Sequence, residues 1–446
     1  MSKHTSTDIR IAIEPDNPAI TRDDVLCVNC TMCKHVCQEY NAVHGHYDLA
    51  LTGDKAICIH CGQCVHACPT GAIRIKSEIE DVVRAIEDPE KIVIVSASPA
   101  VRVALGEALG EEPGAFVEGR MVALLRALGV DFVLDTNFAA DLTIVEEASE
   151  LIERIKTNAP IPQFTSCCPA WVKFAETFHP EILPHLSSAK SPIGMQGATV
   201  KTYFAQKQNL DPKRIFHVAL TPCTAKKFEI RREELNSAAK HLNIEGLRDT
   251  DAVITTVELA QLAKTKGINF ATLPESSFDD LMGQASGAGV IFGNTGGVME
   301  AALRTAYYYL TGEKPPEAFY ELTPVRGLKE VREATIEIAG KPLHVAVVYG
   351  TKNASELIKT LADTHYDFIE VMACPGGCIS GGGQPKLDYG REKEIREKRI
   401  EALYAKDRSM DLRLSFENPE IVALYEALYD KPLSPVAEAM LHTTYV

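Results

Sequence analysis

Short apolar runs alternate with helix-like segments over most of the chain. The apolar runs cover residues 92–96, 132–135, 215–220, 252–255, 345–349 and 368–373. Between them, segments such as 77–90, 120–128 and 257–264 repeat their apolar residues with helical spacing. Short buried runs are typical of strands, and strands that alternate with helices form βαβ units with parallel sheets. We therefore predict an α/β region of mainly parallel sheets flanked by helices.

The two ends of the chain differ from this pattern. Residues 1–24 are polar and lack an apolar signal core or twin arginine, so we expect a flexible leader and a cytoplasmic protein. Residues 393–446 are charged with helical spacing, which predicts a belt of surface helices. The 446 residues, 46% of them hydrophobic, are enough for about two to four domains.

Charge and cysteine content narrow the possible functions. The net charge of −15 disfavours nucleic acid and anionic membranes as partners. No apolar run is long enough to span a bilayer. The 13 cysteines, in a chain without a secretion signal, indicate metal binding or catalysis rather than disulfides.

Eight of the cysteines form an internal repeat between residues 27 and 68. Each run has the spacing C-x2-C-x2-C-x3-C, as in bacterial two-cluster ferredoxins, where the fourth cysteine of a run ligates the other cluster. We expect a small α+β ferredoxin-like domain over residues 25–80. A zinc site is the alternative, but it uses pairs of cysteines rather than runs of four. One expected 4Fe-4S cluster has the ligands Cys27, Cys30, Cys33 and Cys68, and the other has Cys37, Cys58, Cys61 and Cys64.

The remaining five cysteines lie in three stretches that adjoin predicted strands. Residues 165–171 contain Cys167 and Cys168, residues 221–229 contain Cys223, and residues 370–385 contain Cys374 and Cys378. Nearby glycines let the backbone approach a bulky ligand, and ligands of open α/β sheets bind where strand ends meet. A 4Fe-4S cluster takes four thiolates, which leaves one cysteine for another role. The alternative is five unrelated buried cysteines.

These three stretches resemble the signature motifs of the iron-only (FeFe) hydrogenases, and the resemblance runs from about residue 27 to the C-terminus. Members interconvert protons, electrons and dihydrogen at the H-cluster, a 4Fe-4S cluster joined to a di-iron unit with CO, CN and dithiolate ligands. The resemblance implies a two-lobed catalytic domain over residues 88–392. It also implies that residues 393–446 correspond to the family's small subunit, fused to the catalytic domain.

The resemblance assigns roles to individual residues. It implies that Cys168, Cys223, Cys374 and Cys378 hold the 4Fe-4S part, with Cys378 bridging to the di-iron unit. Cys167 would instead carry protons, which a thiol can do because its pKa is tunable. Lys226 would donate a hydrogen bond to a cyanide; the alternative is a surface lysine. The implied proton relay continues through Glu147, Ser187, Glu150 and Arg154.

The stretch that carries these glutamates, residues 145–154, has the pattern of a helix start. Glu147 and Glu150 share one face of it, and a solvated charged face is the alternative interpretation. The family also implies a set of residues around the di-iron unit, which are Ser98, Pro99, Ser191, Pro192, Thr221, Pro222, Phe292 and Met372.

Some positions depart from the best-studied members. Thr221 replaces methionine, Ser98 replaces alanine, and Ala170 replaces glycine, as in the branch often called group B. Gln38 stands where the first cysteine run often has proline. The changes at positions 98, 170 and 221 make the pocket more polar, and Gln38 should alter a turn. All four leave the expected ligands unchanged.

The resemblance implies a ferredoxin hydrogenase that exchanges electrons with ferredoxin, depends on dedicated maturases for its H-cluster, and is a monomer or homodimer. One alternative is a hydrogen-sensing or regulatory homologue of low turnover, although sensors usually carry a ligand-sensing domain and none is visible. Another is a cluster-assembly homologue, which typically lacks the residues that stand here as Cys167 and Lys226. A simple electron carrier would explain residues 27–68 only.

Overall fold

The structure is a computed structural model that describes residues 9–445, and its first lobe is built on a parallel sheet of order β4-β3-β6-β7. The strands are β3 (Ile92–Ala97), β4 (Phe132–Asp135), β6 (Ile215–Thr221) and β7 (Ala252–Thr255). Alternate residues of β3 enter two different cores, Val93 and Val95 on one face and Ile94 on the other. A strand buried on both faces explains the unbroken apolar runs of the sequence. The helices of this lobe are α3 (Ile79–Glu87), α4 (Leu105–Ala108), α5 (Glu118–Ala127), α6 (Thr136–Thr157), α8 (Pro192–Thr199), α9 (Ala205–Lys207), α10 (Lys226–Glu229), α11 (Ser237–Leu242) and α12 (Thr256–Thr265).

The second lobe has a mixed sheet of order β5-β10-β9-β8. Its strands are β5 (Gln163–Phe164), β8 (Val331–Ile338), β9 (Lys341–Tyr349) and β10 (Phe368–Met372). β10 runs parallel to β5 and β9, whereas β8 and β9 form an antiparallel hairpin. Val345 and Val347 of β9 pack on one face and Ala346 and Val348 on the other, so this sheet is also buried on both sides. The helices in this part of the chain are α7 (Pro169–Phe178), α13 (Gly287–Ile291), α14 (Gly297–Thr311) and α15 (Thr351–Thr360).

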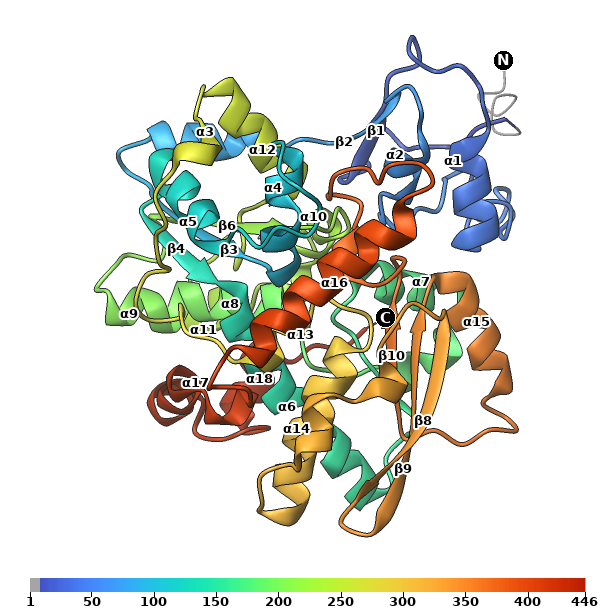
Figure 1. Ribbon diagram of the computed structural model, residues 1–446, viewed down its shortest axis with the longest axis vertical. Helices are drawn as coiled ribbons and strands as arrows, with labels where there is room; N and C mark the ends of the chain where they lie inside the picture. The colour runs from blue at the N-terminus through green and yellow to red at the C-terminus, as the bar shows by residue number, and fades with distance from the viewer. Residues whose placement is uncertain (1–8, 446) are drawn as a thin grey trace.

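The N-terminal part is a small α+β unit that lies beside the lobes at the upper right of Figure 1. It contains β1 (Ile20–Arg22), α1 (Met32–His35), α2 (Gln63–Ala67) and β2 (Ile73–Ile75), and β1 pairs with β2. Ile11, Ala19 and Ile20 pack in its core beside the cysteines. The expectation of a flexible leader is therefore wrong for residues 9–24, because these apolar side chains complete the small core; residues 1–8 lie outside the described part.

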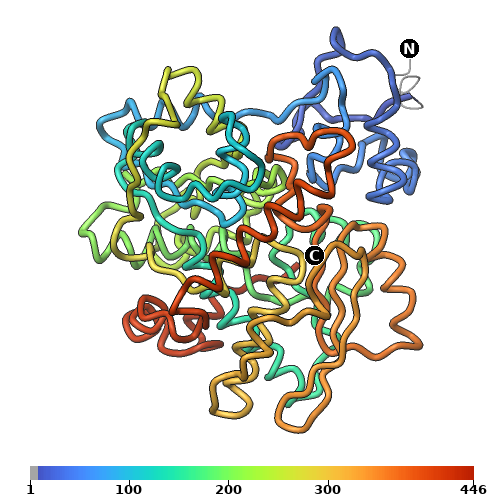
Figure 2. Tube along the Cα trace, viewed as in Figure 1, coloured from blue at the N-terminus to red at the C-terminus, as the bar shows by residue number. Residues whose placement is uncertain are grey.

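The C-terminal segment, residues 393–445, joins the two lobes. Helix α16 (Glu392–Arg408) crosses the molecule diagonally in Figure 1 and buries Ile395, Arg399 and Leu403, which share one face at four-residue spacing. Helices α17 (Pro419–Leu424) and α18 (Pro435–Leu441) follow, and the chain returns to end near the middle of the molecule (Figure 2). The predicted belt of helices thus contributes to the core.

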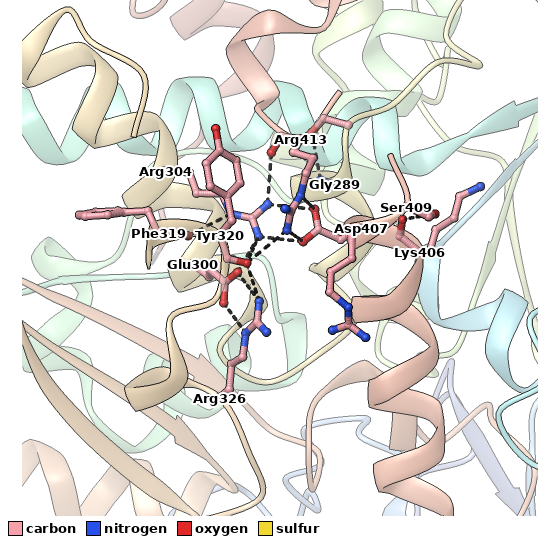
Figure 3. A network of polar contacts seen from close by, with 12 residues as sticks. Gly289, Glu300, Arg304, Phe319, Tyr320, Arg326, Lys406, Asp407, Ser409 and Arg413 are labelled. Atoms are coloured by element: carbon pink, nitrogen blue, oxygen red, sulfur yellow. Dashed lines mark hydrogen bonds and ion pairs between the residues drawn. The ribbon is translucent and has the colours of Figure 1, made fainter. Parts of the chain in front are cut away.

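A buried ion network fastens α16 to α14 (Figure 3). The Arg304 guanidinium donates to Glu300 at 2.6 Å and to Asp407 at 2.9 Å, and all three side chains are fully buried. Arg326 also donates to Glu300, and Arg413 to Asp407, each at 2.7 Å. Buried charges are tolerated only when they are paired in this way.

The predicted fold class, an α/β catalytic region of two lobes with a small ferredoxin-like domain, is confirmed. One local expectation is wrong: residues 145–154 lie in the middle of α6, not at its start. The helix begins after Asp135, whose side chain accepts a hydrogen bond from the Asn137 amide, as N-cap residues do. Within residues 9–445, no helix is both long and apolar enough to cross a membrane.

Candidate active site

The five cysteines of the three stretches line one cavity between the lobes. Cys167 and Cys168 lie between β5 and α7, and Cys374 and Cys378 follow β10, so four of the five come from the second lobe. Cys223 follows β6 of the first lobe. The carboxyl ends of strands from both sheets therefore meet at this cavity, as the topology of open α/β sheets favours.

Four of these thiols lie close enough to affect one another's ionisation. Burial raises the pKa of Cys374 well above its ordinary value, and the neighbouring Cys223 and Cys168 raise it further. Burial and the same two neighbours also raise the pKa of Cys378. In residues 9–445, no three His, Cys, Asp or Glu side chains converge as a single metal ion would require. Four mutually close thiols around a wider cavity fit a 4Fe-4S cluster, which binds thiolates and offsets the cost of their burial.

Two features, one in β10 and one in the loop after it, explain how the backbone comes so near to the cavity. Gly377 has a φ of 97°, and a side chain at this position would meet the Thr295 amide nitrogen at 2.6 Å, so only glycine fits. The Glu370 carboxylate accepts hydrogen bonds from the amides of Gly296 (2.6 Å) and Met299 (2.8 Å) at the start of α14. The glycine-rich stretch 293–300 is thereby held against the cavity.

The eight N-terminal cysteines separate into two groups of four. Cys27, Cys30, Cys33 and Cys68 line one small cavity. Around the other group, burial raises the pKa of the Cys64 thiol, and Cys61, Cys58 and Cys37 raise it further, ahead of Cys33 of the first group. Each group combines the first three cysteines of one run with the fourth cysteine of the other run, as the ferredoxin spacing predicts.

The second of these groups adjoins the main cavity. Cys61 lines that cavity together with Cys374. Gln63 donates hydrogen bonds to the Cys374 sulfur at 3.2 Å and to the Ser380 carbonyl at 3.0 Å. The Thr224 hydroxyl donates to the His60 carbonyl at 2.7 Å. Short buried contacts thus join the small domain to the cavity wall.

The residues expected to relay protons lie in order from the cavity toward the surface. Burial raises the pKa of the Cys167 thiol, and the Glu147 carboxylate beside it raises it further. Burial and the Glu150 charge raise the pKa of Glu147 to about 8, although a hydrogen bond from Ser187 opposes this. The Ser187 hydroxyl donates to Glu150 at 2.7 Å, and Arg154 donates to Glu150 at 2.8 Å.

The alternative of a solvated charged face is wrong for the two central glutamates. Glu147 is 1% exposed and Glu150 is 8% exposed, whereas Glu153 of the same helix points to solvent. Glu150 and Arg154 line an open surface pocket. The structure therefore brings the five expected relay residues together between the cavity and the surface.

Lys226 is buried against the cavity, so the alternative of a surface lysine is wrong. Its ammonium donates to the Cys167 carbonyl at 3.1 Å and to the Glu229 carboxylate at 2.8 and 3.0 Å. The Ser191 hydroxyl also donates to Glu229, at 3.0 Å. The sequence analysis gave Glu229 no role; its three-residue spacing from Lys226 on α10 was a local signal that could have identified it.

The cavity wall contains seven of the eight residues expected around a di-iron unit. These are Ser98, Pro99, Pro192, Thr221, Pro222, Phe292 and Met372. Ser191 is instead turned toward Glu229, and its hydroxyl caps α8 by accepting from the Gly194 amide at 3.3 Å. Thr136 is a lining residue that the sequence analysis missed, and its hydroxyl is buried without a partner. With Ser98 and Thr221 it adds three hydroxyl groups to a mostly apolar wall that also contains Lys226.

Comparison with protein families identifies three matching regions. Residues 91–382 match the iron only hydrogenase large subunit, C-terminal domain. Residues 393–446 match the iron hydrogenase small subunit, and residues 26–73 match the 4Fe-4S dicluster domain. The chain thus carries the iron–sulfur domains that its cysteines predicted.

Curated relatives include hydrogenases and cluster-assembly proteins. The chain is 44% identical over 429 residues to the NADP-reducing hydrogenase subunit HndD of Solidesulfovibrio fructosivorans, covering 95% of this chain and 66% of that protein. It is 45% identical over 381 residues to iron hydrogenase 1 of Clostridium pasteurianum, covering 84% and 65%. It therefore spans just under two thirds of these relatives. Cytosolic iron-sulfur assembly component 3 of Bos taurus is 33% identical over 372 residues, covering 81% and 75%.

A solved structure with the same arrangement is an apo variant of an FeFe-hydrogenase from Chlamydomonas reinhardtii. It matches with a TM-score of 0.73 and 41% identity, covering 83% of this chain and 99% of that one. The family match extends over more than half of the sequence and includes both lobes around the five-cysteine cavity. The chain belongs to the iron-only hydrogenase family.

Proposed function

We propose that this chain is an FeFe hydrogenase that reversibly interconverts dihydrogen with protons and electrons. The observation that carries the proposal is the cavity itself, where four mutually close thiols meet a fifth, Cys167, that adjoins Glu147. An electron carrier needs only the four cluster ligands. A fifth thiol at the head of a buried row of acidic groups is what proton transfer requires.

In this proposal Cys168, Cys223, Cys374 and Cys378 would hold the 4Fe-4S part of the H-cluster, and Cys378 would also hold the di-iron unit. When bound, the H-cluster supplies the metal centre at which protons and electrons combine to dihydrogen. Two further 4Fe-4S clusters, held by the two N-terminal groups of cysteines, exchange electrons with ferredoxin or a similar carrier. The contact of Cys61 with the main cavity supports this route.

The chain's own residues move the proton. Cys167 exchanges a proton with the cavity on one side and with Glu147 on the other. Since burial raises the pKa of Glu147 to about 8, this carboxyl can hold a proton near neutral pH and pass it on. Ser187 links Glu147 to Glu150, and Arg154 orients the Glu150 carboxylate at the surface pocket.

Other residues of the wall position and shield the cofactor. Lys226, held by Glu229, would donate a hydrogen bond to a cyanide ligand of the bound cofactor. Phe292 and Met372 exclude water, while Ser98 and Thr221 give the polar pocket of the group B branch. We further propose a cytoplasmic monomer or homodimer that receives its di-iron unit from maturases.

Two alternative functions, hydrogen sensing and cluster assembly, would give different experimental results. A hydrogen-sensing homologue would load the H-cluster and turn over slowly. A cluster-assembly protein, suggested by the 33% identity to cytosolic iron-sulfur assembly component 3, would hold 4Fe-4S clusters without CO or CN ligands. The full cavity, with Cys167 and Lys226 both in its wall, favours the hydrogenase.

The test is maturation of the chain, followed by infrared spectroscopy, iron analysis and hydrogen evolution from a reduced dye. Wild type should show CO and CN bands and rapid evolution. Cys167→Ser should keep the bands and the iron but lose most turnover, because a hydroxyl is a far weaker acid than a thiol. Cys168→Ala should lose cluster iron. Absent bands in the matured wild type would refute a hydrogenase, and slow turnover with full bands would indicate a sensor.

A further inference from the structure

The C-terminal segment forms one wall of the surface pocket at the outer end of the relay. Glu150, Arg154 and Ser188 lie on one side of this pocket, and Glu438 and His442 lie on the other. The first three belong to the catalytic region and the last two to the part that matches the iron hydrogenase small subunit. The site where the relay meets solvent is thus shared between the two regions.

The end of the segment pairs with the chain beside Ser187. The Thr443 amide donates to the Ser188 carbonyl and the Lys190 amide donates to the Leu441 carbonyl, each at 2.8 Å. Ala189 and His442 form an antiparallel bridge. This pairing brings the His442 ring next to Ser188.

A buried glutamate anchors the same segment to α6. Glu146 is fully buried and precedes Glu147 on the helix. Its carboxylate accepts hydrogen bonds from the Tyr425 hydroxyl, from the Leu433 amide at 2.9 Å and from His442 Nε2 at 3.0 Å. All three donors belong to the C-terminal segment. A buried carboxyl group needs such partners, and within residues 9–445 the hydrogen bonds described for the Glu146 side chain all come from the C-terminal segment.

His442 connects this anchor to the relay. Its Nδ1 lies 2.8 Å from the Ser188 hydroxyl, and the Ser188 amide donates to both Glu150 oxygens at 3.0 and 3.1 Å. The hydroxyl can donate to a neutral ring or accept from a charged one, so this contact persists in either state. Glu150 is therefore held by the Ser187 hydroxyl, by Arg154 and by the Ser188 amide. His442 in turn contacts the side chain of Ser188.

We propose that His442 is a positioning residue for proton transfer: by bridging Glu146 and Ser188, it fixes the backbone amide that holds the Glu150 carboxylate. The small-subunit-like segment then completes the relay rather than merely covering it. This inference rests on the proposed function, in which Glu150 exchanges protons with the surface pocket.

The two bonds of the ring can be removed separately. His442→Gln keeps a donor at the Nε2 position and loses the bond to Ser188, whereas His442→Asn keeps the Nδ1 position and loses the bond to Glu146. Ser188→Ala removes the hydroxyl alone. His241→Ala, at an exposed histidine on α11, is the matched control.

Hydrogen evolution per loaded H-cluster is measured in H2O and in D2O, together with the melting temperature. We expect His442→Gln and Ser188→Ala each to lose about tenfold in turnover and to show a larger solvent isotope effect, since misplacing a reacting group is costly. The double variant should lose no more than either single one. His442→Asn, which loses the anchor on Glu146, should melt at a lower temperature and also lose turnover, and His241→Ala should match wild type.

Unchanged turnover and isotope effect in His442→Gln, whatever its melting temperature, would reduce the contact to a structural one and overturn the proposal. Turnover losses of His442→Gln and Ser188→Ala that multiply in the double variant would also overturn the proposal. If wild type evolves no hydrogen, the proposed function fails. The positioning role is then tested by the rate of hydrogen–deuterium exchange of the Ser188 backbone amide in the unmatured chain. Faster exchange in His442→Gln and Ser188→Ala supports it, and unchanged exchange overturns it.

Discussion

Glu147→Gln should stabilise the protein increasingly as the pH rises. In the folded chain the pKa of Glu147 is about 8 instead of 4.5, because burial and the Glu150 charge disfavour the carboxylate. Between these values the unfolded chain has lost the proton and the folded chain has kept it, so folding takes up a proton and the stability of the wild type falls with pH. Glutamine has the same shape and does not titrate.

The size of the effect follows from the two pKa values. The wild type should lose about 1.4 kcal/mol per pH unit between pH 4.5 and about 8, on the order of 5 kcal/mol in all. Below the lower value the carboxyl is neutral in both states, and above the upper value it is charged in both. The free energy of unfolding of Glu147→Gln relative to wild type should therefore increase only between these two pH values and stay constant above them.

The assay is the melting temperature of the unmatured protein from about pH 5 to about pH 9, at one scan rate and equal cluster content. The variant should gain several degrees over wild type toward the alkaline end. Glu153→Gln, at an exposed position on the same helix, is the control and should show a difference that does not change with pH. A flat difference for Glu147→Gln as well would mean that the folded protein holds an ionised carboxylate, and the view of Glu147 as a proton donor near neutral pH would fail.

Three further predictions concern the pocket, the domain interface and the buried ion network. Thr221→Met should change catalytic bias or inhibitor sensitivity without loss of the CO and CN bands, since Thr221 lines the cavity wall; complete loss of cofactor would make the position structural. Gln63→Leu should lower the reduction potential of the 4Fe-4S part of the H-cluster, because its hydrogen bond to the Cys374 sulfur stabilises the reduced form; an unchanged potential in an EPR redox titration contradicts this. Asp407→Ala should destabilise the protein by about 3–5 kcal/mol, because Arg304 and Arg413 would lose a buried partner; a denaturation midpoint equal to that of wild type would show that Glu300 alone suffices.

The features that could be predicted from the sequence are those with a local signal. Strands such as β4 and β7 appear as short apolar runs because both faces of their sheet are buried. The cysteine spacings of residues 27–68 predicted that Cys68 lies with Cys27, Cys30 and Cys33, which line one cavity in the structure. The assignment of all eight cysteines as cluster ligands stays a prediction.

The features that could not be predicted depend on contacts between distant residues. β5 has only two residues and exists because it pairs with β10, some two hundred positions later. Gln63 reaches Cys374 across 311 positions, and no local pattern marks it. No local pattern marked Glu146 as buried, because its hydrogen-bond partners lie in the C-terminal segment, far along the chain. The start of α6 was different: the capping pattern at Asp135 was present and was overlooked.

Because α16 is covalently continuous with the catalytic region, its buried ion pairs do not have to supply the free energy of association. A separate small subunit would have to offset the loss of translational and rotational freedom on association. In this chain the docking is intramolecular, with an effective concentration set by the connection before α16, where Tyr389 is fully exposed. Buried ion pairs add little net free energy, but they penalise any arrangement that leaves a charge unpaired. The network of Glu300, Arg304 and Asp407 therefore favours one position of α16 along α14, because other positions would leave a buried charge unpaired. The covalent connection keeps the two helices close together.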